Sequence, residues 1–174
     1  ATIDGVTYRV TAIEKNAFKN NRYIKRVIIG NNIITIGDDA FYGCKKLENV
    51  NFGENVKIIG NKAFCKCVTL AKVTIPSKVK TIGKQAFYAC KKLKSATIGK
   101  GVAKIGSKAL YGCSKMKTLT IKSSKLTAKK IGSKAFSKTP KKMTVKVPKK
   151  KFKAYKKMLI KRGVNKKAKF KTVQ

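Results

Sequence analysis

Four of the five cysteines recur at a constant interval and are the first candidates for chemistry. Cys44, Cys67, Cys90 and Cys113 follow one another in steps of 23 residues. Thiols in such a column could bind zinc, form disulfides or act as nucleophiles. The same positions fall on the apolar side of each segment, where an unpaired cysteine behaves as a small buried hydrophobic residue. We therefore predict a buried column of thiols and no metal site; parallel Cβ bonds also disfavour disulfides between neighbours.

Cys65 lies outside this column. It takes the place that Tyr42, Tyr88 and Tyr111 occupy in other repeats, away from the apolar side. We predict that its thiol is exposed and open to oxidation. The tyrosine column itself is a candidate binding surface, with packing between neighbouring repeats as the alternative.

Proton-transfer chemistry has few possible carriers in this chain. It has no histidine and only six carboxylates, all before residue 55. Asp38 and Asp39 are the only adjacent pair, at a place where capping a helix is the simpler role. We predict that the chain is not an enzyme and holds no metal or cofactor.

Positive charge is the dominant chemical feature. Residues 1–54 hold eight Lys or Arg against six acids, a net +2, whereas residues 55–174 hold 36 against none. Only four of the 44 basic residues are Arg (Arg9, Arg22, Arg26 and Arg162). Lysine is a hydrated point charge without the planar fork of arginine, so we expect diffuse, salt-sensitive anion binding. A solvated surface with no partner is the alternative.

A repeat positions all these residues. Ile-Gly begins at residues 36, 59, 82 and 105, and each time Ala and Phe (or Leu), Cys, Leu (or Met) and an alternating apolar pair follow. Such a fixed period indicates a solenoid. In residues 36–52, the spacing of Ile36, Ala40, Phe41 and Cys44 predicts a short helix, and Val50 and Phe52 predict a strand with one buried face. Asp38, Asn61, Ser107 and Ser133 would cap these helices.

The motif Ile-Gly-x-x-Ala-Phe-x-x-Cys-x-x-Leu-x-x-Val-x-Ile resembles the BspA-type leucine-rich repeats of bacterial and some protist surface proteins. The likeness covers nearly the whole chain. It implies an extracellular or cell-surface, non-enzymatic role in adhesion or scaffolding. Together with the repeat, it leads us to expect an α/β fold: a right-handed solenoid of about six 23-residue repeats. A parallel sheet would form one face and short helices the other.

We expect a single domain with a cap at each end. Residues 1–12 form an N-terminal cap, a hairpin about Asp4-Gly5 that covers the first repeat; residues 13–148 are the repeats; residues 149–174 are a basic C-terminal cap. In this last part, Phe152, Tyr155 and Leu159 predict an amphipathic helix before a final strand. Binding of that helix to an anionic membrane is the alternative, and the segment holds no run able to insert in a membrane.

The outward positions of the predicted sheet are the candidate binding site. They carry ammonium and hydroxyl groups in columns, at residues Lys72, Thr74, Lys94, Thr97, Lys117, Thr120, Thr144 and Lys146. We expect this surface, on a monomer, to hold an anionic wall polymer, an acidic glycan or an extracellular protein. Nonspecific binding of nucleic acid through phosphates, or a role as accessory module of a larger surface enzyme, are alternatives. Threonine is also simply a favourable exposed strand residue.

Overall fold

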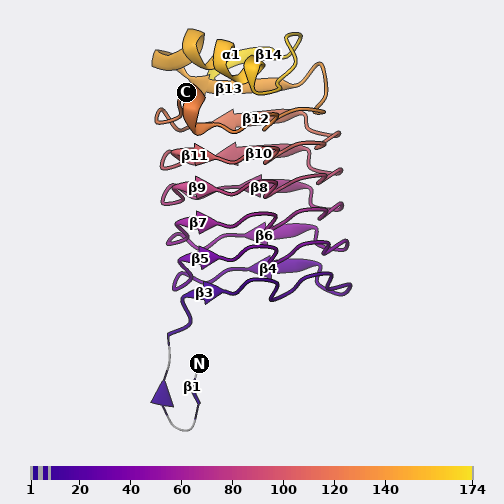
Figure 1. Cartoon of the computed structure of the whole chain (residues 1–174), viewed down its shortest axis with the longest axis vertical. Helices are drawn as coiled ribbons and strands as arrows, with labels where there is room; N and C mark the ends of the chain where they lie inside the picture. The colour runs from indigo at the N-terminus through magenta and orange to yellow at the C-terminus, as the bar shows by residue number, and fades with distance from the viewer. Residues whose placement is uncertain (1, 4–5, 8, 174) are drawn as a thin grey trace.

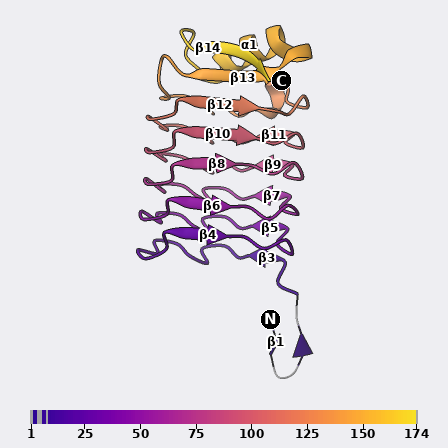
Figure 2. The ribbon, with the colours of Figure 1, turned by 180° about the vertical axis from the view of Figure 1, so that it is seen from behind.

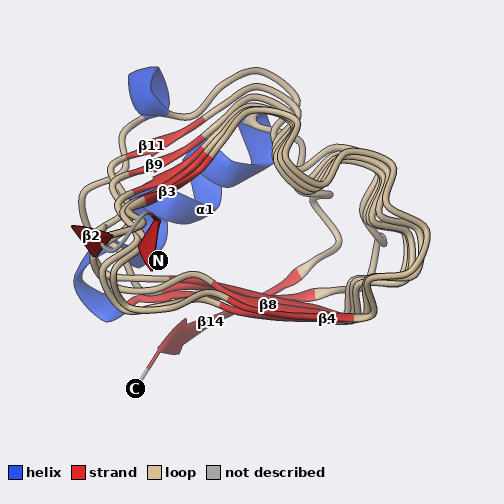
Figure 3. Cartoon of the chain, turned by 90° about the horizontal axis from the view of Figure 1, so that it is seen from below, coloured by secondary structure: helices blue, strands red, loops and turns tan. Residues whose placement is uncertain are grey.

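The computed structural model describes residues 2–3, 6–7 and 9–173 of the chain. From β3 (Ala12–Ile13) to β14 (Lys169–Val173), the chain winds into a stack of parallel coils (Figure 1). Seen along the stack, successive coils superimpose around one interior (Figure 3). The predicted solenoid is confirmed.

One face of the stack is a parallel sheet, as predicted. Five strands are hydrogen-bonded in the order β14-β13-β12-β10-β8, and β4 and β6 form a two-stranded pair that continues this face toward the N-terminal end (Figure 2). Thr97 lies opposite both Thr74 and Thr120 in this register. The strand bounds are β4 (Arg26–Ile28), β6 (Asn49–Asn51), β8 (Lys72–Thr74), β10 (Ser95–Ile98), β12 (Thr118–Ile121) and β13 (Thr144–Pro148).

The opposite face carries a second parallel sheet, in the order β11-β9-β7-β5-β3, followed by turns. The prediction of short helices there is wrong, because each Ile-Gly ends a two-residue strand instead of beginning a helix. Figure 3 shows this sheet across the interior from β8. The bounds are β5 (Thr35–Ile36), β7 (Ile58–Ile59), β9 (Thr81–Ile82) and β11 (Lys104–Ile105).

Left-handed backbone conformations break the expected helices into turns. Asp39 has φ of 55°, and the residues one repeat on, Lys62 and Gln85, have φ of 52° and 55°. A second such position follows four residues later, at Gly43 and Lys66. An α-helix requires negative φ at every residue, so two left-handed residues in each coil exclude it.

Hydrogen bonds between coils compensate for this conformation. Within a turn, every second amide donates to the next coil: Asp39 N to Asn61 O at 2.8 Å and Phe41 N to Ala63 O at 2.7 Å. The amides between them close local turns, as Tyr42 N does to Asp39 O at 2.9 Å. The backbone is therefore hydrogen-bonded without a helix, and neighbouring coils are joined along the turns as well as the sheets.

The polar residues expected to cap helices join coils instead. Asp38 Oδ1 accepts from the amide of Asn61 at 2.6 Å, and Asn61 Oδ1 accepts in turn from the amide of Lys84 at 2.8 Å. Asp38 and Asn61 do accept from backbone amides, as a residue at a helix N-cap would. The helix they were assigned to does not form, so that interpretation is wrong.

Columns of identical apolar side chains fill the interior. Phe41, Phe64 and Phe87 are at most 1% exposed, and their rings stack at 5.1 and 5.3 Å between centroids. Glycines allow the coils to approach this closely. A Cβ on Gly83 would lie 2.5 Å from the carbonyl carbon of Gly60.

The C-terminal end of the stack is covered by the predicted helix and strand. The chain passes through η2 (Lys149–Lys151) into α1 (Phe152–Lys161) and then β14, which pairs with β13. Tyr155, Met158 and Leu159 of α1 are buried. Figure 1 places α1 across the last coils, so its apolar face covers the core end, as expected for this helix.

The N-terminal end is different. Strands β1 (Thr2–Ile3) and β2 (Val6–Thr7) form the predicted antiparallel pair, with Asp4 and Gly5 outside the described residues. Figure 1 shows this pair set apart from β3. Phe18 is 40% exposed and Ile28 is 75% exposed in the first coil. The core is therefore open here, contrary to the expected covering.

Candidate binding surface

The cysteine column is structural, as predicted. Cys44, Cys67, Cys90 and Cys113 are completely buried, and all five thiols of the chain are free. Each column thiol donates to a phenylalanine-position carbonyl of the preceding coil, for example Cys67 Sγ to Phe41 O at 3.1 Å. Burial raises the pKa of Cys113 to about 12 and that of Cys67 further still. These thiols are protonated and inert at neutral pH.

The prediction for Cys65 is wrong. Its side chain is only 3% exposed, and burial raises the pKa of its thiol to about 11. The tyrosines of the same column remain partly exposed and pack between coils: the rings of Tyr88 and Tyr111 stack at 5.2 Å. Lys19 and Lys66 lie over Tyr42, 5.6 and 5.4 Å from its centroid. Cysteine is much smaller than tyrosine, so its side chain stays beneath this layer.

Acid–base and metal chemistry have no assembled site in the part of the chain that the structure describes. No group of three or more His, Cys, Asp or Glu side chains is placed there to hold a metal ion. Asp38, one member of the only adjacent acidic pair, is already bonded to the amide and side chain of Asn61. Among the described helices, none has the length and apolarity to cross a membrane.

The sheet brings several predicted binding residues together. Thr74, Thr97 and Thr120 lie in one register column, which continues into Lys146 and Lys171. Successive strands lie about 4.8 Å apart, so the threonines form a row of hydroxyls roughly 10 Å long. Lys72, two residues before Thr74 in β8, flanks the other end of the row.

These residues line a hollow of about 800 Å³, which we call the sheet hollow. No carboxylate is among its lining residues. They are Lys72, Thr74, Thr97, Thr120, Lys122, Lys146, Lys171, Thr172 and Val173.

Three predicted residues lie beside this hollow instead of lining it. Lys94 and Lys117 precede β10 and β12 by one residue and stand in a column of their own, exposed to solvent. Thr144 begins β13 and lies in the column of Lys72, opposite Thr118. Lys94 and Lys117 lie three residues before Thr97 and Thr120, and side chains alternate along a strand, so they do not share the side of these threonines.

Sequence reasoning missed Lys122, Lys171 and Thr172. Lys122 follows β12 by one residue, where the repeat loses its register. Lys171 and Thr172 belong to β14, which joins the sheet beyond the last repeat. The alternation of lysine and apolar residues at 167–172 predicts a strand, but only the pairing of β14 with β13 places Lys171 beside Lys146.

The sheet face changes in charge along the stack. A neighbouring hollow of about 580 Å³ shares Lys72 and Thr74 with the first but adds Asn49, Asn51 and Glu54. Toward the C-terminal end the equivalent surface is lined by lysine and threonine with Val173, and by no acidic residue. Lysine supplies three N–H donors and a full charge, and threonine can donate or accept. The sheet hollow therefore presents positive charge and hydroxyl groups with no carboxylate among its lining residues.

Comparison with known proteins decides the family. The BspA type leucine rich repeat region matches residues 11–143, in six copies. The chain belongs to the BspA-type leucine-rich repeat family. No match was found among curated proteins.

Solved structures, two of them of leucine-rich repeat proteins, share its fold. A leucine-rich repeat protein from Bacteroides ovatus is 27% identical, with a TM-score of 0.74 over 94% of this chain. A leucine-rich repeat protein of T. pallidum is 26% identical, with a TM-score of 0.64 over 82% of it. The pneumococcal vaccine antigen PcpA is 22% identical, with a TM-score of 0.75 over 93%, a likeness of fold alone. The chain spans 40%, 69% and 39% of these structures respectively.

Proposed function

We propose that this chain is a non-catalytic binding scaffold of the cell surface or extracellular space that holds an anionic polymer on its sheet face. The row of Thr74, Thr97 and Thr120, with lysines at both ends and no carboxylate in the hollow, is the observation that carries the proposal. Membership of the BspA-type family supports a scaffold role.

A linear anion fits this surface better than a compact one. The row of hydroxyls runs across the strands, parallel to the stack, and is followed in the same column by Lys146 and Lys171. A chain with an anionic group every few ångströms could place several groups along it. A wall polymer with repeating phosphates or an acidic glycan has this form. An acidic segment of an extracellular protein would present carboxylates in the same way.

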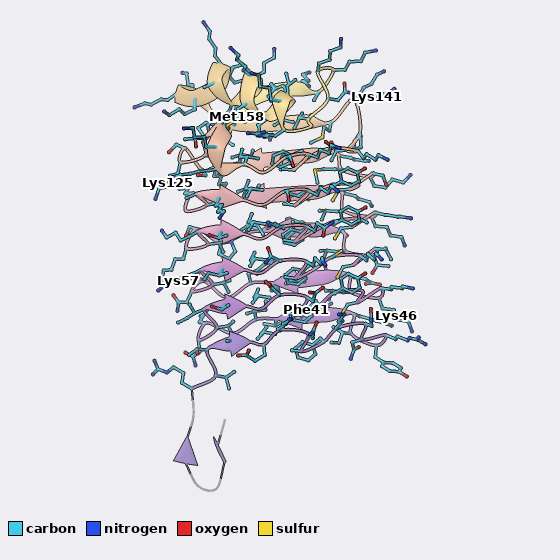
Figure 4. All side chains as sticks on the ribbon, viewed as in Figure 1. Phe41, Lys46, Lys57, Lys125, Lys141 and Met158 are labelled. Atoms are coloured by element: carbon cyan, nitrogen blue, oxygen red, sulfur yellow. The ribbon has the colours of Figure 1, made fainter. Side chains whose placement is uncertain are left out.

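A matched pair of variants tests the proposal. The sheet variant Lys72→Ala, Lys146→Ala, Lys171→Ala removes three charges from the sheet hollow. The control variant Lys46→Ala, Lys115→Ala, Lys141→Ala removes three exposed charges elsewhere. Lys46 and Lys141 lie at the edge of the stack opposite Lys57 and Lys125 in Figure 4, and Lys115 occupies the repeat position of Lys46. The two variants therefore have the same net charge as each other.

Binding of a glycerol-phosphate polymer, a sulfated glycan and duplex DNA is measured from low to physiological salt. We expect the sheet variant to lose at least tenfold in affinity for one polymer and the control less than threefold. Equal losses in the two variants would show diffuse attraction and contradict the proposal. If the chain binds all three polyanions with equal affinity and the same steep salt dependence, the binding is nonspecific attraction between charges. That result would favour the alternative in which the chain binds nucleic acid through its phosphates.

A further inference from the structure

A second basic hollow lies where the repeat register is interrupted. Ile105 and Ile131 begin consecutive repeats that are 26 residues apart instead of 23. The three additional residues lengthen the connection after β12 into a loop at residues 122–127, next to η2 of the C-terminal cap. The loop, η2 and two earlier turns enclose a hollow of about 680 Å³.

Seven lysines line this space, which we call the lysine hollow. The loop supplies Lys122 and Lys125, η2 supplies all three of its residues, and earlier turns supply Lys80 and Lys100. Ser77 and Ser124 add hydroxyls, and no acidic residue is among the lining. Figure 4 shows Lys125 at the edge of the stack opposite Lys141.

The loop is held in place by buried contacts. Ser123 is completely buried, and its hydroxyl donates to the carbonyl of Val102 and accepts from the amide of Lys125 at 3.1 Å. The buried Leu126 donates its amide to the hydroxyl of Tyr155 in α1 at 3.1 Å. The loop is thus fixed to the repeats on one side and to the cap on the other, which orders its lysines before any ligand arrives.

The same turn is less basic in earlier coils. Lys100 occupies the repeat position of Ser77 and of Glu54, which are 23 and 46 residues before it. The hollow at the corresponding edge of the first coils is lined by Asn31, Asn32 and Asn55 with Thr11 and three basic side chains. There Asn55 Nδ2 donates to the backbone carbonyl of Asn31 at 2.8 Å, and Asn55 Oδ1 accepts from Lys78 Nζ at 2.6 Å, so both ends of this amide are already bonded. The concentration of lysine is therefore specific to the interrupted turn.

Seven ammonium groups around one space repel one another. Two charges 5 Å apart in bulk water repel by roughly 0.8 kcal/mol, and a partly enclosed site strengthens the effect. An anion with several charges would relieve many such repulsions at once. Ammonium groups can also donate to a phosphate that approaches from any direction, because they lack the fixed planar geometry of a guanidinium.

We propose that the lysine hollow binds a compact ligand with clustered phosphates, either a short polyphosphate chain or a sugar-like ring that carries several phosphate groups. Lysines converge on it from four segments of chain, which suits phosphates that point in different directions. The volume falls within the range of small-molecule sites, about 300–1,000 Å³. This site shares Lys122 with the sheet hollow but is otherwise lined by different residues, and its occupancy does not require the proposed function.

Calorimetric titration with tripolyphosphate, inositol hexakisphosphate and orthophosphate at 150 mM salt tests the proposal. We expect one molecule of a clustered phosphate per chain, bound at least 100-fold more tightly than orthophosphate. Tighter binding of tripolyphosphate would assign a linear source, and tighter binding of the hexakisphosphate a ring. Several weak ligands per chain, or no preference over orthophosphate, would overturn it.

A hollow variant, Lys122→Ala, Lys125→Ala, Lys150→Ala, provides the residue-level test. All three side chains are exposed, and near-ultraviolet circular dichroism checks that the fold is retained. We expect at least a 30-fold loss of clustered-phosphate affinity in this variant and less than threefold in both the sheet and the control variants. An equal loss in the three variants would overturn the site. Because the sheet variant is tested with polymers and the hollow variant with small phosphates, failure of one proposal is distinguishable from failure of the other.

Discussion

The first and last coils share one architecture but differ in what surrounds it. In the first coils, polar side chains bond from coil to coil, as Asp38 does with Asn61, and the apolar end at Phe18 is partly exposed. In the last coils, the outer positions are mostly lysine, and α1 covers the core. The interior columns continue through both regions, with apolar replacements such as Leu110 in the phenylalanine column and Met116 in the leucine column. The fold is therefore specified by the interior and the backbone ladders, and the outer positions are free to vary in charge.

The largest effect that distinguishes the two regions is expected in the phenylalanine column. Phe64 is fully buried between Phe41 and Phe87, whereas Phe18 closes the column with 40% of its surface exposed. Phe64→Ala should lower the free energy of unfolding by about 3–5 kcal/mol, because it leaves a cavity within the stack. Phe18→Ala should cost about 1 kcal/mol, since the site is already open to water. Urea unfolding of both variants gives the comparison, and equal costs would contradict a core that opens at one end.

Glycines provide the next test. A Cβ on Gly83 would lie 2.5 Å from the amide of Asn61 in the preceding coil, whereas one on Gly30 would meet nothing within 4 Å. Gly83→Ala should cost about 1–3 kcal/mol or more by forcing the coils apart. Gly30→Ala should be neutral or stabilise by about 0.4–1 kcal/mol through the unfolded state. Thermal and urea unfolding measure both changes.

A reversal of these two glycine effects would show that the coils are not in close backbone contact at Gly83. A similar small effect at both positions would have the same meaning.

A smaller effect is expected where the cap meets the interrupted turn. Tyr155 is 2% exposed and its hydroxyl accepts from the amide of Leu126, whereas Tyr23 is 83% exposed. Tyr155→Phe leaves that buried amide without its acceptor and should cost about 1–3 kcal/mol. Tyr23→Phe should change the free energy of unfolding by less than about 0.5 kcal/mol. Amide exchange at Leu126 should also accelerate in Tyr155→Phe, and unchanged exchange there would contradict the anchoring of the loop.

The interior was predictable from sequence because its signal repeats. Cys44, Phe41 and Leu47 recur every 23 residues, and each proved to be buried. The turns were not predictable, because the spacing of Ile36, Ala40 and Phe41 fits a helix equally well. What decides against the helix is the left-handed conformation of Asp39 and the bonds to the next coil, and neither has a residue signature.

The candidate site was predictable in part for the same reason. Thr74, Thr97 and Thr120 repeat with the period, so their column could be read directly. Lys122 and Lys171 lie where the period fails, in the enlarged turn and in the strand after α1. Their positions follow from three-dimensional pairing that no local pattern encodes.

The smallest effect concerns a thiol and leaves the fold intact. Burial raises the pKa of Cys65 from 9.0 to about 11, and alkylation requires the thiolate. The rate of iodoacetamide labelling at Cys65 should therefore rise until about pH 11 before it levels. The same shift favours folding below pH 9 and is lost as the pH rises through about 11. Mass spectrometry of the labelled peptide follows the rate, and a plateau near pH 9 would show an exposed thiol.

Chemical-shift mapping of the isotope-labelled chain tests the division of roles most directly. A glycerol-phosphate polymer is added at physiological salt, and amide and side-chain shifts are followed along the stack. Shifts should concentrate at Thr74, Thr97 and Thr120 and at the lysines beside them, and leave Asn31 and Asn55 unmoved. Equal shifts over lysines on every side of the molecule, or none on the sheet face, would contradict a binding surface formed by the outer positions of the sheet.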